Sequence, residues 1–308
     1  MACAAIVGLP FALLSGASAE EHQWQTTTRG NLDIDAAADS SPLERTYGFS
    51  TFGQQAASVP LEFGALFAGI TYIGIKNWNW GNSSFRFHPE HWFGRSTGSG
   101  GTDKLGHFYT TYVMSDLLFH AIRRNSYLQD GAELTAATLA VGLMFYVEIF
   151  DGYSGDHGFS REDMTMDLLG AGFSILRNSV PGLRETLDFR MEYQPSGYKG
   201  FDPLADYAGQ KYLFALKLAG FEAIRESPLR FVELHAGYYT RGFTKEERAL
   251  GLDKERNLYF GVGLNLQELL FGAPAIKSHW AGQVGRSVLE YVQVPYTSLD
   301  AKHGIDGK

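Results

Sequence analysis

Four stretches between residues 59 and 180 are apolar at helical spacing, with few charges inside them. The second stretch ends at Arg123 and Arg124, and a basic pair suits the last turn of a helix because the helix dipole is negative there. The fourth begins at Ser160, which with Asp163 approximates a capping box. The predicted helices cover residues 59–75, 102–124, 132–150 and 160–180, and they predict a bundle of about four helices over residues 56–182.

After Gly182 the apolar residues alternate with polar ones, which is the period of β-strands. In LYFGVGLNL, for example, Leu258, Phe260, Val262 and Leu264 share one face. About five such segments predict an antiparallel sheet over residues 183–308 that packs on the helices, so the predicted fold class is α+β. An outer-membrane barrel is the alternative, but a closed barrel needs about eight strands or more. The predicted strands are DFRMEYQP, KYLFALKLAGFEA, RFVELHAGYYTRGF, RNLYFGVGLNL and SVLEYVQVPY.

The first residues have the pattern of an export signal. An apolar stretch is followed by Ala17-Ser18-Ala19, the small-x-small shape of a cleavage site, so residues 1–19 are predicted to be a signal peptide. The alternative is an N-terminal anchor or a mis-started coding sequence. Residues 20–55 are polar and predict a loosely packed leader. Cys3 could carry a lipid only if further residues precede it.

Composition narrows the classes of function. A net charge of −8, with no basic stripe and no finger motif, argues against a nucleic-acid partner. Cys3 is the single cysteine, which excludes a disulfide framework and a thiolate metal site. An exported chain of this kind fits a bacterial periplasm or envelope.

Glu148 raises the main chemical question, because it lies at the end of an apolar helix and a buried carboxylate needs a partner or a proton. Polar residues also occur at the start of the second predicted helix and of the fourth. If consecutive helices are antiparallel, these three helix ends meet. The predicted cluster consists of Asp103, Lys104, His107, Glu148, Asp151, Asp163 and Asp167.

The cluster admits three interpretations. First, imidazole and carboxylate ligands suit a divalent ion such as Zn, Mn or Mg, and the candidate metal ligands are Asp103, His107, Glu148, Asp151, Asp163 and Asp167. Second, His107 could act as a base that Glu148 orients, while Lys104 steadies an anion such as a lipid phosphate, which makes these three the candidate catalytic residues. Third, the cluster could be structural, with a buried Lys104–Glu148 pair that fixes helix register.

The motifs DKLGHF, E-x-x-D and G-x-S-x-x-D-x-x-x-D-x-x-G-A occur in this order and resemble the bacterial "predicted periplasmic lipoprotein" family of unknown function over about residues 100–180. A weaker likeness connects the first motif to VanZ-like membrane proteins. Asp151 stands where the VanZ-like pattern has Gln, and the mean hydropathy of −0.15 argues against a polytopic protein. The family resemblance implies an envelope location and supplies no reaction.

We therefore expect an envelope protein, periplasmic or associated with the outer membrane, whose polar cluster is its functional or structural centre. The alternative is a metal-dependent hydrolase or transferase that acts on envelope lipids. Membrane or other envelope components are the expected partners, and the sequence leaves the oligomeric state open. Trp78, Trp80 and Trp92 suit an interfacial belt, a sugar platform or core packing.

Overall fold

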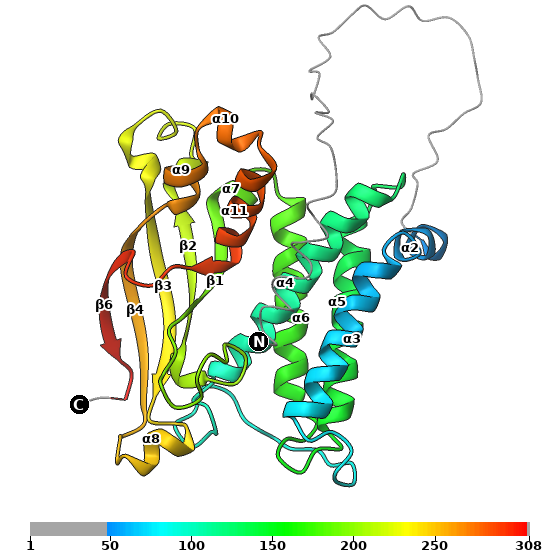
Figure 1. The fold of residues 1–308 in the computed structure, drawn as a ribbon, viewed down its shortest axis with the longest axis vertical. Helices are drawn as coiled ribbons and strands as arrows, with labels where there is room; N and C mark the ends of the chain where they lie inside the picture. The colour runs from blue at the N-terminus through cyan, green and yellow to red at the C-terminus, as the bar shows by residue number, and fades with distance from the viewer. Residues whose placement is uncertain (1–47, 307–308) are drawn as a thin grey trace, which may run out of the picture.

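The computed structural model describes residues 48–306, in which a helical part lies beside a β-sheet (Figure 1). The α+β class is confirmed. The predicted signal peptide and residues 20–47 of the predicted leader lie outside the described residues. The end of that leader is not loose, because helix α2 occupies Phe49–Ala56 and its Gln55 is buried.

The four predicted helices are present, and each lies within a few residues of its predicted range. Helix α5 lies against α4 and α6 along their lengths. The apolar core of the bundle comes from buried side chains such as Leu118, Ala136 and Leu143. The capping role of Ser160 is confirmed, because its side chain accepts a hydrogen bond from the backbone N–H of Asp163. The helices are α3 (Pro60–Asn77), α4 (Thr102–Asn125), α5 (Ala132–Asp151) and α6 (Arg161–Ser179).

The sheet has six strands in the order β5-β1-β2-β3-β4-β6, with β5 and β6 at its edges. All pairs are antiparallel except β1 with β5, so the sheet is mixed rather than purely antiparallel as we expected. The strands are β1 (Leu187–Tyr193), β2 (Gln210–Lys217), β3 (Val232–Arg241), β4 (Glu255–Leu264), β5 (Val292–Gln293) and β6 (Ser298–Gly304).

The prediction of a strand over SVLEYVQVPY is wrong for most of its length. Residues up to Tyr291 belong to helix α11 (Trp280–Tyr291), and only β5 is extended. The reason is that Val284 and Val288 are one helical turn apart and pack on the same aromatic cluster. The remaining short elements are α7 (Leu183–Thr186), α8 (Lys245–Ala249), α9 (Leu266–Phe271), α10 (Pro274–Lys277) and the 3₁₀ turns Tyr207–Gly209, Leu218–Gly220 and Pro228–Phe231.

One edge of the sheet packs on the bundle through aromatic side chains. Phe189 of β1 and Tyr212 of β2 contact Tyr109 and Phe108 of α4, and Phe173 of α6 packs on the same cluster. Further along, the apolar face predicted for β4 is exposed, whereas the opposite face, with Tyr259, is buried. The alternation was therefore correct, but the apolar face of β4 is the outer one.

A network of buried charged side chains joins the helical bundle to the sheet near the C-terminal end of α6. Arg177 of α6 forms ion pairs with Asp116 of α4 at 3.0 Å and with Asp188 of β1 at 2.6 Å. Arg190 continues the network from Asp188, at 2.6 Å, to Glu233 at 2.7 Å. Because these charges are buried, they remain stable only as a paired set.

Candidate functional site

The three helix ends that carry the predicted cluster meet in the structure. The start of α4, the end of α5 and the start of α6 bring their polar side chains to one end of the bundle. Two groups form there. One surrounds His107 and the other surrounds Lys104, and Asp163 lies between them, 4.0 Å from Nε2 of His107.

The first group contains His107, Glu148 and Asp167. Nδ1 of His107 lies 3.3 Å from Oδ1 of Asp167 and 3.8 Å from Oε1 of Glu148. The other oxygen of Glu148 accepts a hydrogen bond of 2.9 Å from the backbone N–H of Ser160. One ligand atom from each of the three side chains lies within 4.8 Å of the others, so their donor set could hold a metal ion. Glu148 is thus held by His107 and by the start of α6.

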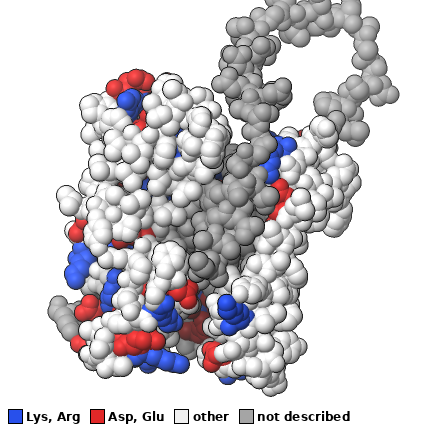
Figure 2. Space-filling view, viewed as in Figure 1, with Lys and Arg blue, Asp and Glu red and all other residues white. Residues whose placement is uncertain are grey.

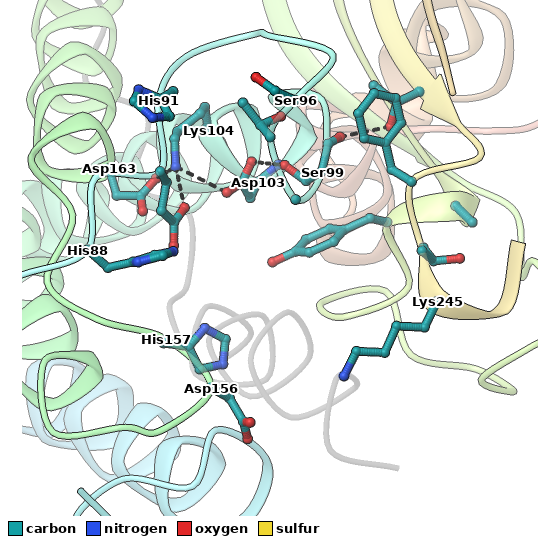
Figure 3. Close-up of a pocket in the computed structure, with 18 of the residues that line it drawn as sticks. His88, His91, Ser96, Ser99, Asp103, Lys104, Asp156, His157, Asp163 and Lys245 are labelled. Atoms are coloured by element: carbon teal, nitrogen blue, oxygen red, sulfur yellow. Dashed lines mark hydrogen bonds and ion pairs between the residues drawn. The ribbon is translucent and has the colours of Figure 1, made fainter. Parts of the chain in front are cut away.

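The second group surrounds Lys104, whose side chain is buried (Figure 3). Its Nζ lies 2.5 Å from Glu90, 2.7 Å from Asp163 and 3.1 Å from Asp103. Within the part of the chain that the structure describes, these three carboxylates are its ion-pair partners, so the Lys104–Glu148 pair that we considered does not form. Ligand atoms of these three carboxylates also lie within 4.8 Å of one another. The positive charge of Lys104, which contacts all three, nevertheless makes this group less suited to a metal ion than the first one.

Asp151 lies apart from both groups. Its Oδ1 accepts a hydrogen bond of 2.6 Å from the indole N–H of Trp80, and Trp80 packs on the bundle core. The structure therefore gathers the other predicted site residues into two groups and leaves Asp151 on the wall of the adjoining cavities.

Sequence reasoning missed several residues of the site. Glu90 belongs to the loop HPEHW. This loop has neither helical nor strand periodicity, so the sequence does not indicate where Glu90 lies relative to the helices. Thr111 donates a hydrogen bond of 2.7 Å to Asp167, and its position one turn after His107 on α4 is a signal that could have identified it. Ser99, just before α4, donates to Asp103.

The carboxylates outnumber the cations, and this imbalance shifts pKa values. Burial raises the pKa of Glu148 to about 9, although the neighbouring His107 acts in the opposite direction. Burial and the charge of Asp163 raise the pKa of Glu90 to about 8, against the effect of Lys104. Burial alone would lower the pKa of His107. The negative charges of Asp163 and Asp167 outweigh the effect of burial, so the pKa of His107 is raised well above its ordinary value.

Replacing Glu90 with glutamine is expected to remove part of the pH dependence of stability. The pKa of Glu90 is about 4.5 in the unfolded chain and about 8 in the folded one. A raised carboxyl pKa contributes stability fully below the unfolded value, and this contribution is lost as the pH rises through the folded value. The melting temperature of the wild type should therefore fall between about pH 4.5 and pH 8, and that of Glu90→Gln should fall less. The prediction is contradicted if the melting temperatures of the wild type and of Glu90→Gln change with pH to the same extent.

Two cavities meet at the site. The first, of about 650 Å³, is lined mainly by polar and charged residues and is called the polar cavity below. His88, His157 and Lys245 border it and approach it from different segments (Figure 3). The second, of about 330 Å³, is mainly apolar and extends along α4 past Val113 and Leu117. The residues that line both cavities are Asp103, His107, Asp151, His157, Lys199 and Tyr207.

A comparison with protein-family models gave a match to part of the chain. The model of a family described as "Predicted periplasmic lipoprotein (DUF2279)" matches residues 89–179, whereas the searches of curated proteins and of solved structures gave no match. The matched segment begins at the loop with Glu90 and ends with α6, so it holds both polar groups. Its description supports an exported, envelope location. The resemblance inferred from the motifs is thereby confirmed: residues 89–179 are similar to the predicted periplasmic lipoprotein family, whose function is uncharacterised.

Proposed function

We propose that this protein is an envelope enzyme that binds an anionic, acyl-chain-bearing lipid and hydrolyses one of its ester bonds, with His107 as the acid–base residue. The observation that carries the proposal is the junction of the polar and the apolar cavity at His107. An amphipathic ligand fits such a pair of cavities, because each of its two parts then contacts surface of its own polarity.

The linings of the two cavities match the two parts of a lipid. The apolar cavity is bordered by side chains such as Leu66, Ile70 and Met144, which suit an acyl chain. The polar cavity is lined by carboxylates on one side, and Lys245 lies across the cavity from Asp103 and Asp163 (Figure 3). Lys245, together with Lys199 and Arg248, would attract an anionic headgroup such as a phosphate. The ester bond between these parts would then lie close to His107.

The surroundings of His107 suit proton transfer. Nδ1 is oriented by the buried Asp167, as in other sites where a carboxylate positions a histidine. Nε2 is the remaining ring nitrogen, and His107 borders both cavities. Because its raised pKa keeps His107 protonated, in the proposed step His107 first gives its proton to the leaving oxygen while the water oxygen bonds to the carbonyl carbon or phosphorus of the ester. The neutral ring then takes up the proton that the water loses, which restores His107.

A metal-dependent hydrolase is the second candidate. It is favoured by Oδ2 of Asp167, which is buried and has no hydrogen-bond partner among the described residues. This oxygen belongs to the His107 group, whose donors are one imidazole and two carboxylates. A divalent cation bound there would polarise the scissile ester.

The test uses the purified full chain in mixed micelles of phosphatidylglycerol, phosphatidylethanolamine or cardiolipin, with products measured by mass spectrometry. His107→Ala is expected to keep lipid binding and to lose at least about 100-fold in hydrolysis. Val113→Phe should fill the apolar cavity and weaken lipid binding itself. Asp156→Asn is the matched control, because Asp156 borders the polar cavity but lies outside the His107 group.

Metal analysis of the same samples separates the two candidates. Bound metal that is lost in Asp167→Asn and kept in Asp156→Asn, with hydrolysis abolished by chelation, would support the metal-dependent enzyme. Hydrolysis that survives chelation would support His107 alone. If the folded wild type neither binds nor hydrolyses any of the three lipids, the proposed function is wrong.

A further inference from the structure

The outer face of the sheet is apolar over several strands. On β4 the side chains of Phe260 and Val262 are 62% and 52% exposed, while the buried side chains of the same strand belong to Asn257 and Tyr259. A sheet between a core and water shows the reverse pattern. Because large exposed apolar patches mark interaction surfaces, this face needs a partner.

Strand pairing makes the apolar face continuous. Phe260 is in register with Ala236 of β3 and Ala301 of β6, and Val262 is in register with Leu234 and Leu299. Leu299 is 85% exposed. On the opposite face Glu233 and His235 are buried, while Asp300 and Lys302 of the edge strand β6 share that face and are exposed. Arg256 alternates onto the outer face but lies at the start of β4, away from Phe260 and Val262. The outer face therefore presents apolar side chains from the middle of β3 to the edge strand β6.

The helices carry a matching apolar zone. No charged residue occurs between Glu62 and Lys76 on α3, between Glu133 and Glu148 on α5, or between Asp167 and Arg177 on α6. Within these zones the exposed large side chains are Phe67, Tyr72 and Ile75 on α3, Leu134 and Phe145 on α5, and Leu168, Leu169 and Leu176 on α6.

Helix α5 by itself meets the length and composition of a membrane span, with 44% of its most apolar window buried. The bent pair α2 and α3 meets the same test when taken together. Fewer than half of the residues in this window are buried, so one side of α5 faces away from the rest of the described chain.

On the face in Figure 2, charged side chains gather toward the two ends of the described part. Blue and red atoms lie over its lower part and near its upper ends, and white atoms cover much of the described surface between them. The lower end carries the polar site, and exposed aromatic residues lie beside it, namely Phe87, Trp92 and Tyr153. Aromatic side chains between an apolar zone and a charged end are typical of a membrane interface.

The dimensions of the zone agree with a thin bilayer. Leu258 to Leu264 spans about 20 Å at the rise of a β-strand. The uncharged part of α5 spans about 21 Å at the rise of an α-helix. Both lengths are close to the apolar band of about 25 Å in outer-membrane proteins.

We propose that this apolar belt, formed by the outer faces of β2–β4, β6, α3, α5 and α6, is embedded among the acyl chains of a lipid bilayer, with the polar site at its edge. Figure 1 supports a bilayer over a single protein partner, because α3 and β6 lie on opposite sides of the molecule. A partner on one side would leave the other side uncovered, whereas acyl chains surround the whole belt. This inference does not depend on the lipid hydrolysis proposed above.

The test reconstitutes the purified full chain into vesicles of phosphatidylethanolamine and phosphatidylglycerol, removes the detergent and measures flotation after an alkaline carbonate wash. The wild type is expected to float and to resist the wash. The double variant Phe260→Glu and Val262→Glu should lower the vesicle-bound fraction more than about tenfold, because charges on a lipid-facing strand are costly. Circular dichroism in detergent checks that the variant is folded.

Leu250→Glu is the matched control. Leu250 is also an exposed apolar residue, but it follows α8 at the charged end, outside the belt. It should float like the wild type. The inference is overturned if Leu250→Glu lowers flotation as much as the double variant does. It is also overturned if the detergent-free wild type stays in solution, as a monomer or as an oligomer whose copies cover the belt.

Discussion

Replacing Arg177 with methionine is expected to lower the free energy of unfolding by about 3–5 kcal/mol. The guanidinium is fully buried and lies within 3.3 Å of Asp116, Asp188 and Glu290. Its Nε also donates a hydrogen bond of 2.9 Å to the backbone oxygen of Leu187. Methionine fills part of the volume but leaves buried carboxylates with fewer partners. Denaturant unfolding in detergent, followed by tryptophan fluorescence, measures the change.

Arg123→Met is the control for this prediction. Arg123 is exposed in the last turn of α4, so its replacement should change stability by no more than about 0.5 kcal/mol. Asp116→Asn combined with Arg177→Met should cost less than the sum of the single changes, because the two side chains share one ion pair. A loss below about 1 kcal/mol in Arg177→Met would mean that the network is solvated.

The helices of the site could be predicted because their sequence signals agree. Apolar residues at helical spacing, the cap at Ser160 and the basic end of α4 all indicate the same boundaries. The strands of the sheet were harder to predict from the sequence. Strand β6, SLDAKHG, has no apolar period because it is an exposed edge, and α11 was misread because a short amphipathic helix can resemble an alternating strand.

The sequence also predicted that three helix ends converge, because antiparallel neighbours place the start of one helix beside the end of the next. The sequence could not predict which of these side chains form ion pairs or hydrogen bonds with which others. Lys104 forms an ion pair with Glu90 rather than with Glu148. Glu90 lies in a loop whose sequence has neither helical nor strand periodicity. The choice depends on side-chain directions and loop position, and neither follows from spacing along a helix.

The outer face of β4 illustrates a related limit. Alternation shows that two faces differ, but it does not show which of them meets solvent or lipid. Only the pairing of β4 with β3 and β6, and the burial of Tyr259 on the opposite side, place the apolar residues outside.

Replacing Gly170 with alanine is expected to lower the free energy of unfolding by about 1–3 kcal/mol, although alanine favours a helix. Gly170 lies where α6 crosses α4, and an added Cβ would collide with the backbone oxygen of Phe108. The backbone cannot move aside as a flexible side chain would, so the two helices must separate. Thermal unfolding measures the loss.

The same change should also disturb the site, because Asp167 is one turn before Gly170 on α6 and His107 is next to Phe108 on α4. Separation of the helices lengthens the contact of 3.3 Å between these two side chains, so lipid hydrolysis should fall along with stability. Gly172→Ala is the matched control on the same helix, because its Cβ would meet nothing within 4 Å. It should leave hydrolysis unchanged and raise stability by up to about 1 kcal/mol. Equal effects of the two variants would show that the close crossing of α4 and α6 does not hold the site together.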